Sequence, residues 1–163
     1  MTTGDDSVRK RFPGRPPRIK LFAHIRPFYF VTFNTADRKR ILDNLSLHQG
    51  FIDYATRGYH SYGVAVGRYM ILPDHIHLFV VLPESGPVLQ TWVKGLKALL
   101  GRVLIEQGFS RPHWQPGFFD HVLRSAESYG EKWQYVSMNP VRARLCNKPE
   151  DWPWQGEVAR LRF

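Results

Sequence analysis

The chain has 163 residues, a length that suits one domain with its own hydrophobic core. Its 43% of hydrophobic and 14% of aromatic residues are typical of a globular protein and exclude a disordered one. Lys and Arg number 23 against 14 Asp and Glu, and this net charge of +9 favours a polyanionic partner such as nucleic acid. Simple solubility is the alternative explanation of the charge.

Three further features of the composition predict a cytoplasmic protein. No apolar run approaches the ~20 residues of a membrane span, so we expect no membrane partner. The first residues lack the apolar core of a secretion signal. The single cysteine, Cys146, excludes an internal disulfide and a thiolate zinc cage, which fits a reducing compartment.

Residues 1–26 differ in composition from residues 27–163, which we predict to be the folded domain. The first segment alternates prolines with basic residues, namely Arg9, Lys10, Arg11, Arg15, Arg18 and Lys20. Closely spaced prolines oppose a helix, so we predict an extended, flexible arm that follows a phosphate backbone. The alternative is a tail without a partner.

The hydrophobic pattern of residues 27–163 predicts alternating strands and helices. Strands are expected at residues 28–33, 62–72, 75–82 and within 113–123, and helices at 39–57, 88–107 and 126–138. Gly58 and Asn139-Pro140 are the expected stops of the first and third helices. The order β-α-β-β-α-β followed by a helix predicts an α+β, ferredoxin-like fold: a four-stranded antiparallel sheet with two helices on one face. The other face is expected to stay open, and a tail with Trp152 and Trp154 to pack back on the body.

A pair of histidines lies on the strand expected at residues 75–82. A strand alternates its faces with a period of two, so His75 and His77 share one face while Ile76 and Leu78 face the helices. Two imidazoles about 4–5 Å apart can converge on one divalent ion. Without a cysteine cluster, such an open site favours Mg²⁺ or Mn²⁺ gripped partly by substrate phosphate. The alternative is two ordinary polar histidines.

The third helix carries a tyrosine and an amide one turn apart, Tyr135 and Asn139, which can face the same phosphate. Arg142 and Arg144 place positive charge beside it. A free phenol is a poor nucleophile at neutral pH, and a nearby cation favours its phenolate. The alternatives are a Tyr135 that is only a core aromatic, and Tyr129 as a rival nucleophile on another face of the helix.

Three motifs, in this order, resemble the REP-associated tyrosine transposases, relatives of the insertion-sequence transposases that move as single-stranded DNA. They are Pro73-Asp74-His75-Ile76-His77-Leu78, then Trp114-Gln115 with Phe118-Phe119-Asp120-His121-Val122-Leu123-Arg124, and Tyr135-Val136-Ser137-Met138-Asn139-Pro140-Val141-Arg142-Ala143. The resemblance extends from about Phe28 to Trp154. Two departures stand out. Asn139 replaces the glutamine usual in the insertion-sequence relatives, and Ser137 replaces a histidine frequent in the family.

The resemblance implies that residues 27–163 form a HUH nuclease domain, with His75, His77 and Asn139 as metal ligands and Tyr135 as the nucleophile. The implied reaction is transesterification of single-stranded or hairpin DNA, in which the tyrosine becomes joined to the 5′-phosphate. Relatives occur as monomers and as homodimers. The expected DNA contacts are Arg9, Lys10, Arg11, Arg15, Arg18, Lys94, Lys97, Arg142 and Arg144. Asp120 and His121 are expected to orient a metal-binding histidine from outside the ligand shell, or Asp120 to form a structural ion pair with Arg124.

Three other functions stay open on sequence alone. The same βαββαβ order builds non-catalytic, RRM-like nucleic-acid-binding modules, which would leave the histidines and Tyr135 idle. A metal-dependent phosphodiesterase would use water in place of the tyrosine. A former transposase kept for regulation would have a decayed site, to which the missing histidine after Tyr135 points.

Overall fold

The computed structural model describes residues 26–162, so the predicted basic residues between Arg9 and Lys20 lie outside the described part of the chain. The elements follow one another in the predicted order. They are β1 (Phe28–Asn34), η1 (Ala36–Arg38), α1 (Leu45–Tyr62), β2 (Ala65–Leu72), β3 (His75–Val81), α2 (Leu89–Glu106), β4 (Phe119–Leu123), α3 (Ala126–Ser137), α4 (Asn139–Arg142), η2 (Pro149–Asp151) and β5 (Gln155–Glu157).

The sheet has the strand order β4-β1-β3-β2-β5, with every neighbouring pair antiparallel. Its first four strands have the predicted ferredoxin-like arrangement. The prediction of four strands was wrong because a fifth, β5, pairs with the edge strand β2. Its three residues, Gln-Gly-Glu, carry no alternating apolar pattern. They pair because the returning tail is held beside β2, where the indole of Trp152 donates a hydrogen bond of 2.9 Å to the carbonyl of Ile71. The predicted packing of the tail on the body is confirmed.

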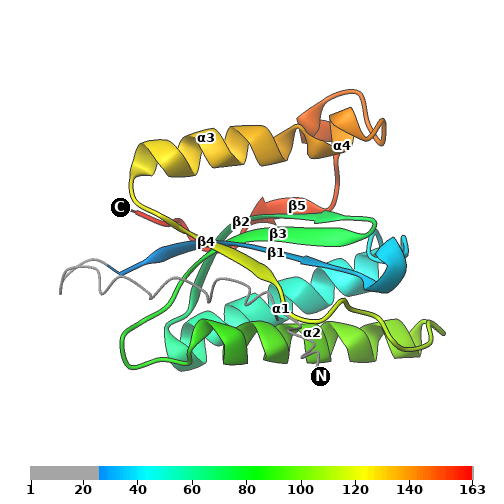
Figure 1. The fold of residues 1–163 in the computed structure, drawn as a ribbon, viewed down its shortest axis with the longest axis horizontal. Helices are drawn as coiled ribbons and strands as arrows, with labels where there is room; N and C mark the ends of the chain where they lie inside the picture. The colour runs from blue at the N-terminus through cyan, green and yellow to red at the C-terminus, as the bar shows by residue number, and fades with distance from the viewer. Residues whose placement is uncertain (1–25, 163) are drawn as a thin grey trace, which may run out of the picture.

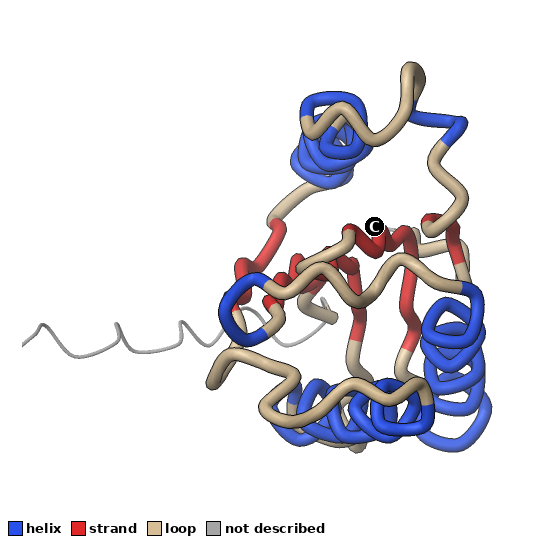
Figure 2. The backbone as a smooth tube through the Cα atoms, turned by 90° about the vertical axis from the view of Figure 1, so that its right-hand side faces the viewer, coloured by secondary structure: helices blue, strands red, loops and turns tan. Residues whose placement is uncertain are grey.

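Helices cover both faces of the sheet (Figures 1 and 2). Helices α1 and α2 lie on one face, over a core that includes Ile76, Leu78 and Val80 of β3. Helix α3 lies across the other face, where Trp133 and Val136 pack against a second apolar cluster of the sheet. The prediction of an open second face was therefore wrong. The reason is that this face also carries large apolar side chains, which α3 removes from water.

Helix α1 begins and ends about five residues later than the pattern predicted. Asn44 caps its N-terminus by accepting a hydrogen bond of 3.0 Å from the backbone N–H of Leu47. At the other end Gly63, not Gly58, terminates the helix with a left-handed φ of 67°, a conformation that glycine adopts without penalty. The third helix, α3, ends as predicted directly before Asn139-Pro140, with Ser137 as its last residue and Met138 as its C-cap. Pro140 lies in the first turn of the short helix α4, where a proline is tolerated.

Between residues 26 and 162, no helix is both long and apolar enough to span a lipid bilayer.

Two glycines, one at the end of α1 and one inside α3, supply a matched test of this fold. We expect Gly63→Ala to lower the free energy of unfolding by about 1 kcal/mol, because alanine must adopt the left-handed conformation there. In Gly130→Ala the new Cβ meets no atom within 4 Å inside α3, so the higher helix propensity of alanine should raise stability by up to about 1 kcal/mol. Urea unfolding followed by tryptophan fluorescence measures both, and equal effects of the two substitutions would contradict the assigned end of α1.

Candidate active site

The two histidines project from the start of β3 onto the face covered by α3 and α4. In the antiparallel register, Thr32 of β1 stands opposite His77 and Asn34 opposite His75. The ring centroids of the two imidazoles are 4.8 Å apart, at an interplanar angle of 84°. This separation lies in the range expected for two ligands of one ion.

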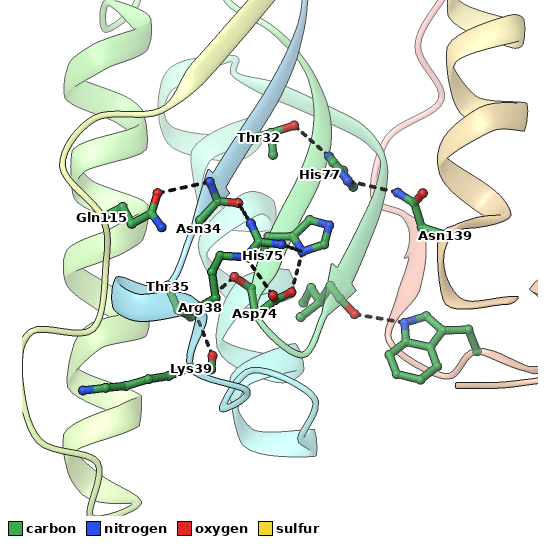
Figure 3. A network of polar contacts seen from close by, with 12 residues as sticks. Thr32, Asn34, Thr35, Arg38, Lys39, Asp74, His75, His77, Gln115 and Asn139 are labelled. Carbon is green, nitrogen blue, oxygen red and sulfur yellow. Dashed lines mark hydrogen bonds and ion pairs between the residues drawn. The ribbon is translucent and has the colours of Figure 1, made fainter. Parts of the chain in front are cut away.

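An ion pair beside the strand holds the ring of His75 (Figure 3). Its Nδ1 lies 2.6 Å from Oδ1 of Asp74, whose other oxygen accepts a hydrogen bond of 2.8 Å from Nε of Arg38. Burial opposes ionisation of Asp74, but the hydrogen bond and charge of His75 and the charge of Arg38 outweigh it and lower the pKa of the carboxyl. An ionised carboxylate only accepts, so Nδ1 of His75 carries the proton and Nε2 presents its lone pair.

A second set of contacts fixes His77. Its Nδ1 lies 2.7 Å from Oγ1 of Thr32, and its Nε2 lies 3.1 Å from Nδ2 of Asn139 (Figure 3). The orientation of that amide follows from Arg142, which donates a hydrogen bond to Oδ1 of Asn139, since a guanidinium has no acceptor. The amide nitrogen therefore donates to Nε2 of His77, which presents a lone pair as His75 does.

The protonation of both imidazoles suits metal ligation. Burial is the main cause that lowers the pKa of His75 and lowers that of His77 to about 3, with His75, Lys132 and Arg38 adding to the effect on His77. Both rings are therefore neutral at physiological pH, which is the state that binds a metal. Among the described residues no cluster of three or more His, Cys, Asp or Glu side chains could hold an ion. The donors present fit an open site of two nitrogens and one amide oxygen, completed by oxygens from outside the chain. Asn139 can offer its oxygen only if the amide turns over from the orientation described above.

Tyr135 lies at the end of α3, beside Asn139. Its side chain is 65% exposed, and the guanidinium of Arg142 stacks 4.2 Å from the centroid of its ring. Arg142 also donates a hydrogen bond of 2.7 Å to the backbone carbonyl of Tyr135. Direct contacts thus run from Tyr135 through Arg142 and Asn139 to His77. Among the described residues there is no ring contact between Tyr135 and either imidazole.

The rival tyrosine, Tyr129, occupies a different environment. Its ring packs edge-on against Phe79 of the sheet, with centroids 4.6 Å apart, and burial raises the pKa of its phenol. A buried phenol with a raised pKa is less available as a nucleophile. The exposed Tyr135 is the better candidate.

Several of the predicted site residues lie away from the imidazoles. Asp120 stands opposite Val31, on the α1 and α2 side of the sheet, so the prediction that it orients a histidine is wrong; Thr32 and Asp74 hold that position. His121 stands opposite Phe30 on the imidazole side, at the edge strand β4. Neither it nor Asp120 contacts His75 or His77 in the described part of the chain.

The predicted DNA contacts also fall in different places. Lys94 is exposed on α2, on the far side of the sheet from Tyr135. The ammonium of Lys97 donates hydrogen bonds of 2.8 Å to the carbonyls of Gln115 and Gly117, so it anchors the segment before β4. Arg142 and Arg144 are both exposed, and Arg142 contacts the tyrosine. Ser137, which replaces the family's histidine, donates a hydrogen bond to its own helix at Gln134.

Sequence patterns did not reveal Thr32, Arg38 or Lys132 as parts of the site. The ammonium of Lys132 lies 5.3 Å from the ring centroid of Phe30, and that ring stacks on His77 at 5.4 Å, so α3 brings a cation beside the pair. Arg38 has a left-handed φ of 55° and contacts both Asn34 and Asp74. Arg38 contacts Asp74, which lies 36 residues later in the chain, and Thr32 contacts His77, which lies 45 residues later. A local sequence pattern does not indicate contacts between residues so far apart.

Comparison with solved structures finds two proteins whose fold is similar to that of this chain. The structure of a REP-associated tyrosine transposase bound to a REP hairpin is similar to this chain with a TM-score of 0.66 and 20% sequence identity, over 86% of this chain and 92% of that one. A crystal structure of a candidate transposase from Deinococcus radiodurans gives a TM-score of 0.51 at 19% identity, over 71% and 92%. At these identities the similarity shows a shared fold.

Sequence comparison finds two similar proteins that carry the same family name. The REP-associated tyrosine transposase of Escherichia coli K12 is 25% identical over 89 residues, which cover 55% of this chain and 52% of that protein. A candidate member of the same family from Haemophilus influenzae is 27% identical over 138 residues, 77% of each chain. The chain is thus a relative of the REP-associated tyrosine transposases, although it spans about half the length of the Escherichia coli protein. No family model matches it.

The low pKa of His77 predicts a particular loss of stability in acid. The unfolded chain takes up a proton on this histidine near its ordinary pKa of 6.5, whereas the folded chain does so only near pH 3. The stabilisation is therefore complete above pH 6.5 and is lost as the pH falls toward 3. In chelator, His77→Gln should show a shallower decline of unfolding free energy between pH 6.5 and 4 than the wild type. His60→Gln, at an exposed position, is the control, and parallel curves for all three proteins would contradict this assignment.

Proposed function

We propose that this protein cuts and rejoins single-stranded or hairpin DNA by metal-assisted attack of Tyr135 on a phosphodiester. The observation that carries the proposal is the line of contacts from Tyr135 through Arg142 and Asn139 to His77. It joins an exposed phenol on a helix to a pair of neutral imidazoles on a strand. The relatives support the substrate class, since one protein of the same fold is described bound to a REP hairpin.

Each of these side chains has a chemical task in the proposed reaction. Oη of Tyr135 attacks the phosphorus, the bond from phosphorus to the 3′-oxygen breaks, and the proton lost by the phenol is balanced by one gained at the 3′-oxygen. The product is a 5′-phosphotyrosine, which a second 3′-hydroxyl can reseal by the reverse exchange without ATP. Arg142, stacked on the phenol, is placed to bind the phosphate and to favour the phenolate.

The histidine pair would hold a divalent ion, Mg²⁺ or Mn²⁺, through its two Nε2 atoms, with Asn139 as a third ligand. The chemistry that such an ion supplies is neutralisation of charge on the phosphate oxygens in the transition state. Thr32 and Asp74 keep both Nε2 lone pairs available by holding the Nδ1 atoms. Lys132 and Arg38 add positive charge around the phosphate position.

The rival functions fit these observations less well. An RRM-like module needs an exposed sheet face with stacking aromatics, and here α3 covers that face. A phosphodiesterase that uses water would give Tyr135 no role, although Arg142 holds its ring beside the site. A decayed site is favoured by one observation only, the serine at position 137 that bonds to its own helix.

Formation of a covalent adduct tests the proposal directly. We expect the wild type with Mn²⁺ and a single-stranded oligonucleotide carrying a hairpin to form a protein–DNA species that survives denaturing electrophoresis. Tyr135→Phe should form none, and His77→Ala should lose at least about 100-fold in rate because the phosphate charge is no longer neutralised. Tyr62→Phe is the matched control, since Tyr62 is 63% exposed on the opposite helix layer, and it should react as the wild type does.

Three results would contradict this proposal. Cleavage by Tyr135→Phe at the wild-type rate without an adduct would favour the water-using phosphodiesterase. DNA binding without cleavage by the wild type, in Mg²⁺ or Mn²⁺, would favour the binding module or the decayed site. An adduct mapped by mass spectrometry to another tyrosine would exclude Tyr135 as the nucleophile.

The contacts that Thr32 and Asp74 make with the Nδ1 atoms of the two histidines are expected to strengthen metal binding. Loss of a side chain that orients a metal-binding histidine weakens the metal site by about 10–100-fold. We therefore expect Asp74→Ala and Thr32→Val each to weaken Mn²⁺ binding by that factor, measured by calorimetry without DNA. Asp43→Ala removes an exposed carboxylate elsewhere and should bind as the wild type does. Unchanged affinity in both site variants would mean that the imidazoles do not hold the ion.

A further inference from the structure

A groove with four arginines lies at the end of the sheet opposite the histidine pair. It has a volume of about 920 Å³ and is bordered by the starts of β1 and β2 and the end of β3. Its arginines come from three separate parts of the chain: Arg26 before β1, Arg124 after β4, and Arg160 and Arg162 near the C-terminus. Figure 1 shows these parts converging where α3 begins. We name this feature the arginine groove.

The arginine groove carries positive charge that the described part of the chain does not neutralise. All four arginines are exposed. No Asp or Glu lines the groove, and within residues 26–162 none of the four forms an ion pair or a side-chain hydrogen bond. This differs from Arg38 and Arg142, whose guanidiniums are held by Asp74 and by Asn139. Four unpaired guanidiniums around one hollow are suited to phosphate oxygens, which they bind with paired N–H groups.

Helix α3 fixes the separation between the arginine groove and the candidate active site. Ser125 caps the start of α3 and lines the groove, and Tyr135 lies ten residues further along the same helix. At 1.5 Å per residue the two points are about 15 Å apart. The strands agree, since the seven residues of β1 run from Phe28 at the groove to Asn34 beside His75, about 20 Å. This distance corresponds to about five base pairs of a double helix, at 3.4 Å each.

We propose that the arginine groove binds the sugar–phosphate backbone of the double-stranded stem of the DNA, while its single-stranded part lies at Tyr135. This inference rests on the proposed function and adds a second, non-catalytic contact to it. A duplex has twice the phosphate density of a single strand, which suits guanidiniums that converge from three parts of the chain. Contacts of this kind position the DNA and do not read its sequence. They would place the contacted stem phosphates about 15–20 Å from the scissile bond.

Removal of two arginines from separate parts of the chain, Arg124→Gln with Arg160→Gln, tests the groove. Binding is measured in a Tyr135→Phe background, so that it does not depend on cleavage. The probes are a hairpin with a single-stranded flank, a blunt hairpin of arbitrary sequence, and the flank alone. For both hairpins we expect at least a tenfold loss of affinity at about 0.1 M salt, and a slope of log K against log salt that is smaller by about 2. Binding of the flank alone should stay within about threefold of the parent.

The matched control removes the same charge from the opposite helix layer. In Arg57→Gln with Arg102→Gln, the affinity should stay within about threefold of the parent and the salt slope within about 0.5. If only the net charge attracted the DNA, the control pair and the groove pair would lose affinity equally. With Tyr135 restored, the groove variant should still form an adduct with a short single strand at the wild-type rate, and thermal unfolding confirms that each variant is folded.

Two results would overturn the inference. Equal losses in the groove pair and the control pair would mean that only net charge matters. A loss confined to the single-stranded flank would assign the groove to unpaired nucleotides, which Tyr59 and His60 at its wall could stack. Failure of the wild type to form any adduct would overturn the proposed function alone, because the binding measurements decide the groove separately.

Discussion

The candidate site depends on the packing of α3 against the second face of the sheet. The histidines belong to β3, whereas Tyr135, Asn139 and Arg142 belong to the helical segment, and the chain between them contains α2 and β4. What holds the two parts together is an apolar contact. Trp133 and Val136 of the helix cover Phe79 and its neighbours on the sheet. Burial of about 150–250 Å² by each large aromatic side chain stabilises this contact, and it sets the position of every polar group beyond it.

The site combines neutral ligands with positive surroundings. Burial keeps both imidazoles unprotonated, so their lone pairs stay available, and the cations Arg38, Lys132 and Arg142 stand around them. These positive charges weaken the binding of a divalent ion, and a phosphate would supply the balancing charge. A site of this composition is therefore expected to bind metal and DNA together better than it binds either alone. The amide of Asn139 contacts both His77 and Arg142, and so links the imidazole pair to one of these cations.

Helix α3 also gives the molecule two functional ends. Its first turn borders the arginine groove and its last turn carries Tyr135, so a single rigid element sets the distance between the proposed phosphate-binding surface and the proposed nucleophile. A helix of this length bends little, and the spacing is therefore preserved when side chains at either end change.

Sequence patterns alone determined the parts of this protein that depend on neighbouring residues. Period-two alternation put His75 and His77 on one face of a strand, helical spacing paired Tyr135 with Asn139, and the order of the elements indicated the ferredoxin-like sheet. The closure of the second face by α3, the addition of β5, and the contacts of Thr32, Arg38 and Lys132 were decided by the tertiary structure. These features join residues far apart in the chain, and their physical basis is burial and hydrogen bonding between surfaces that exist only after folding. The arginine groove belongs with them, because its arginines are scattered from residue 26 to residue 162 and only the folded chain brings their charges together.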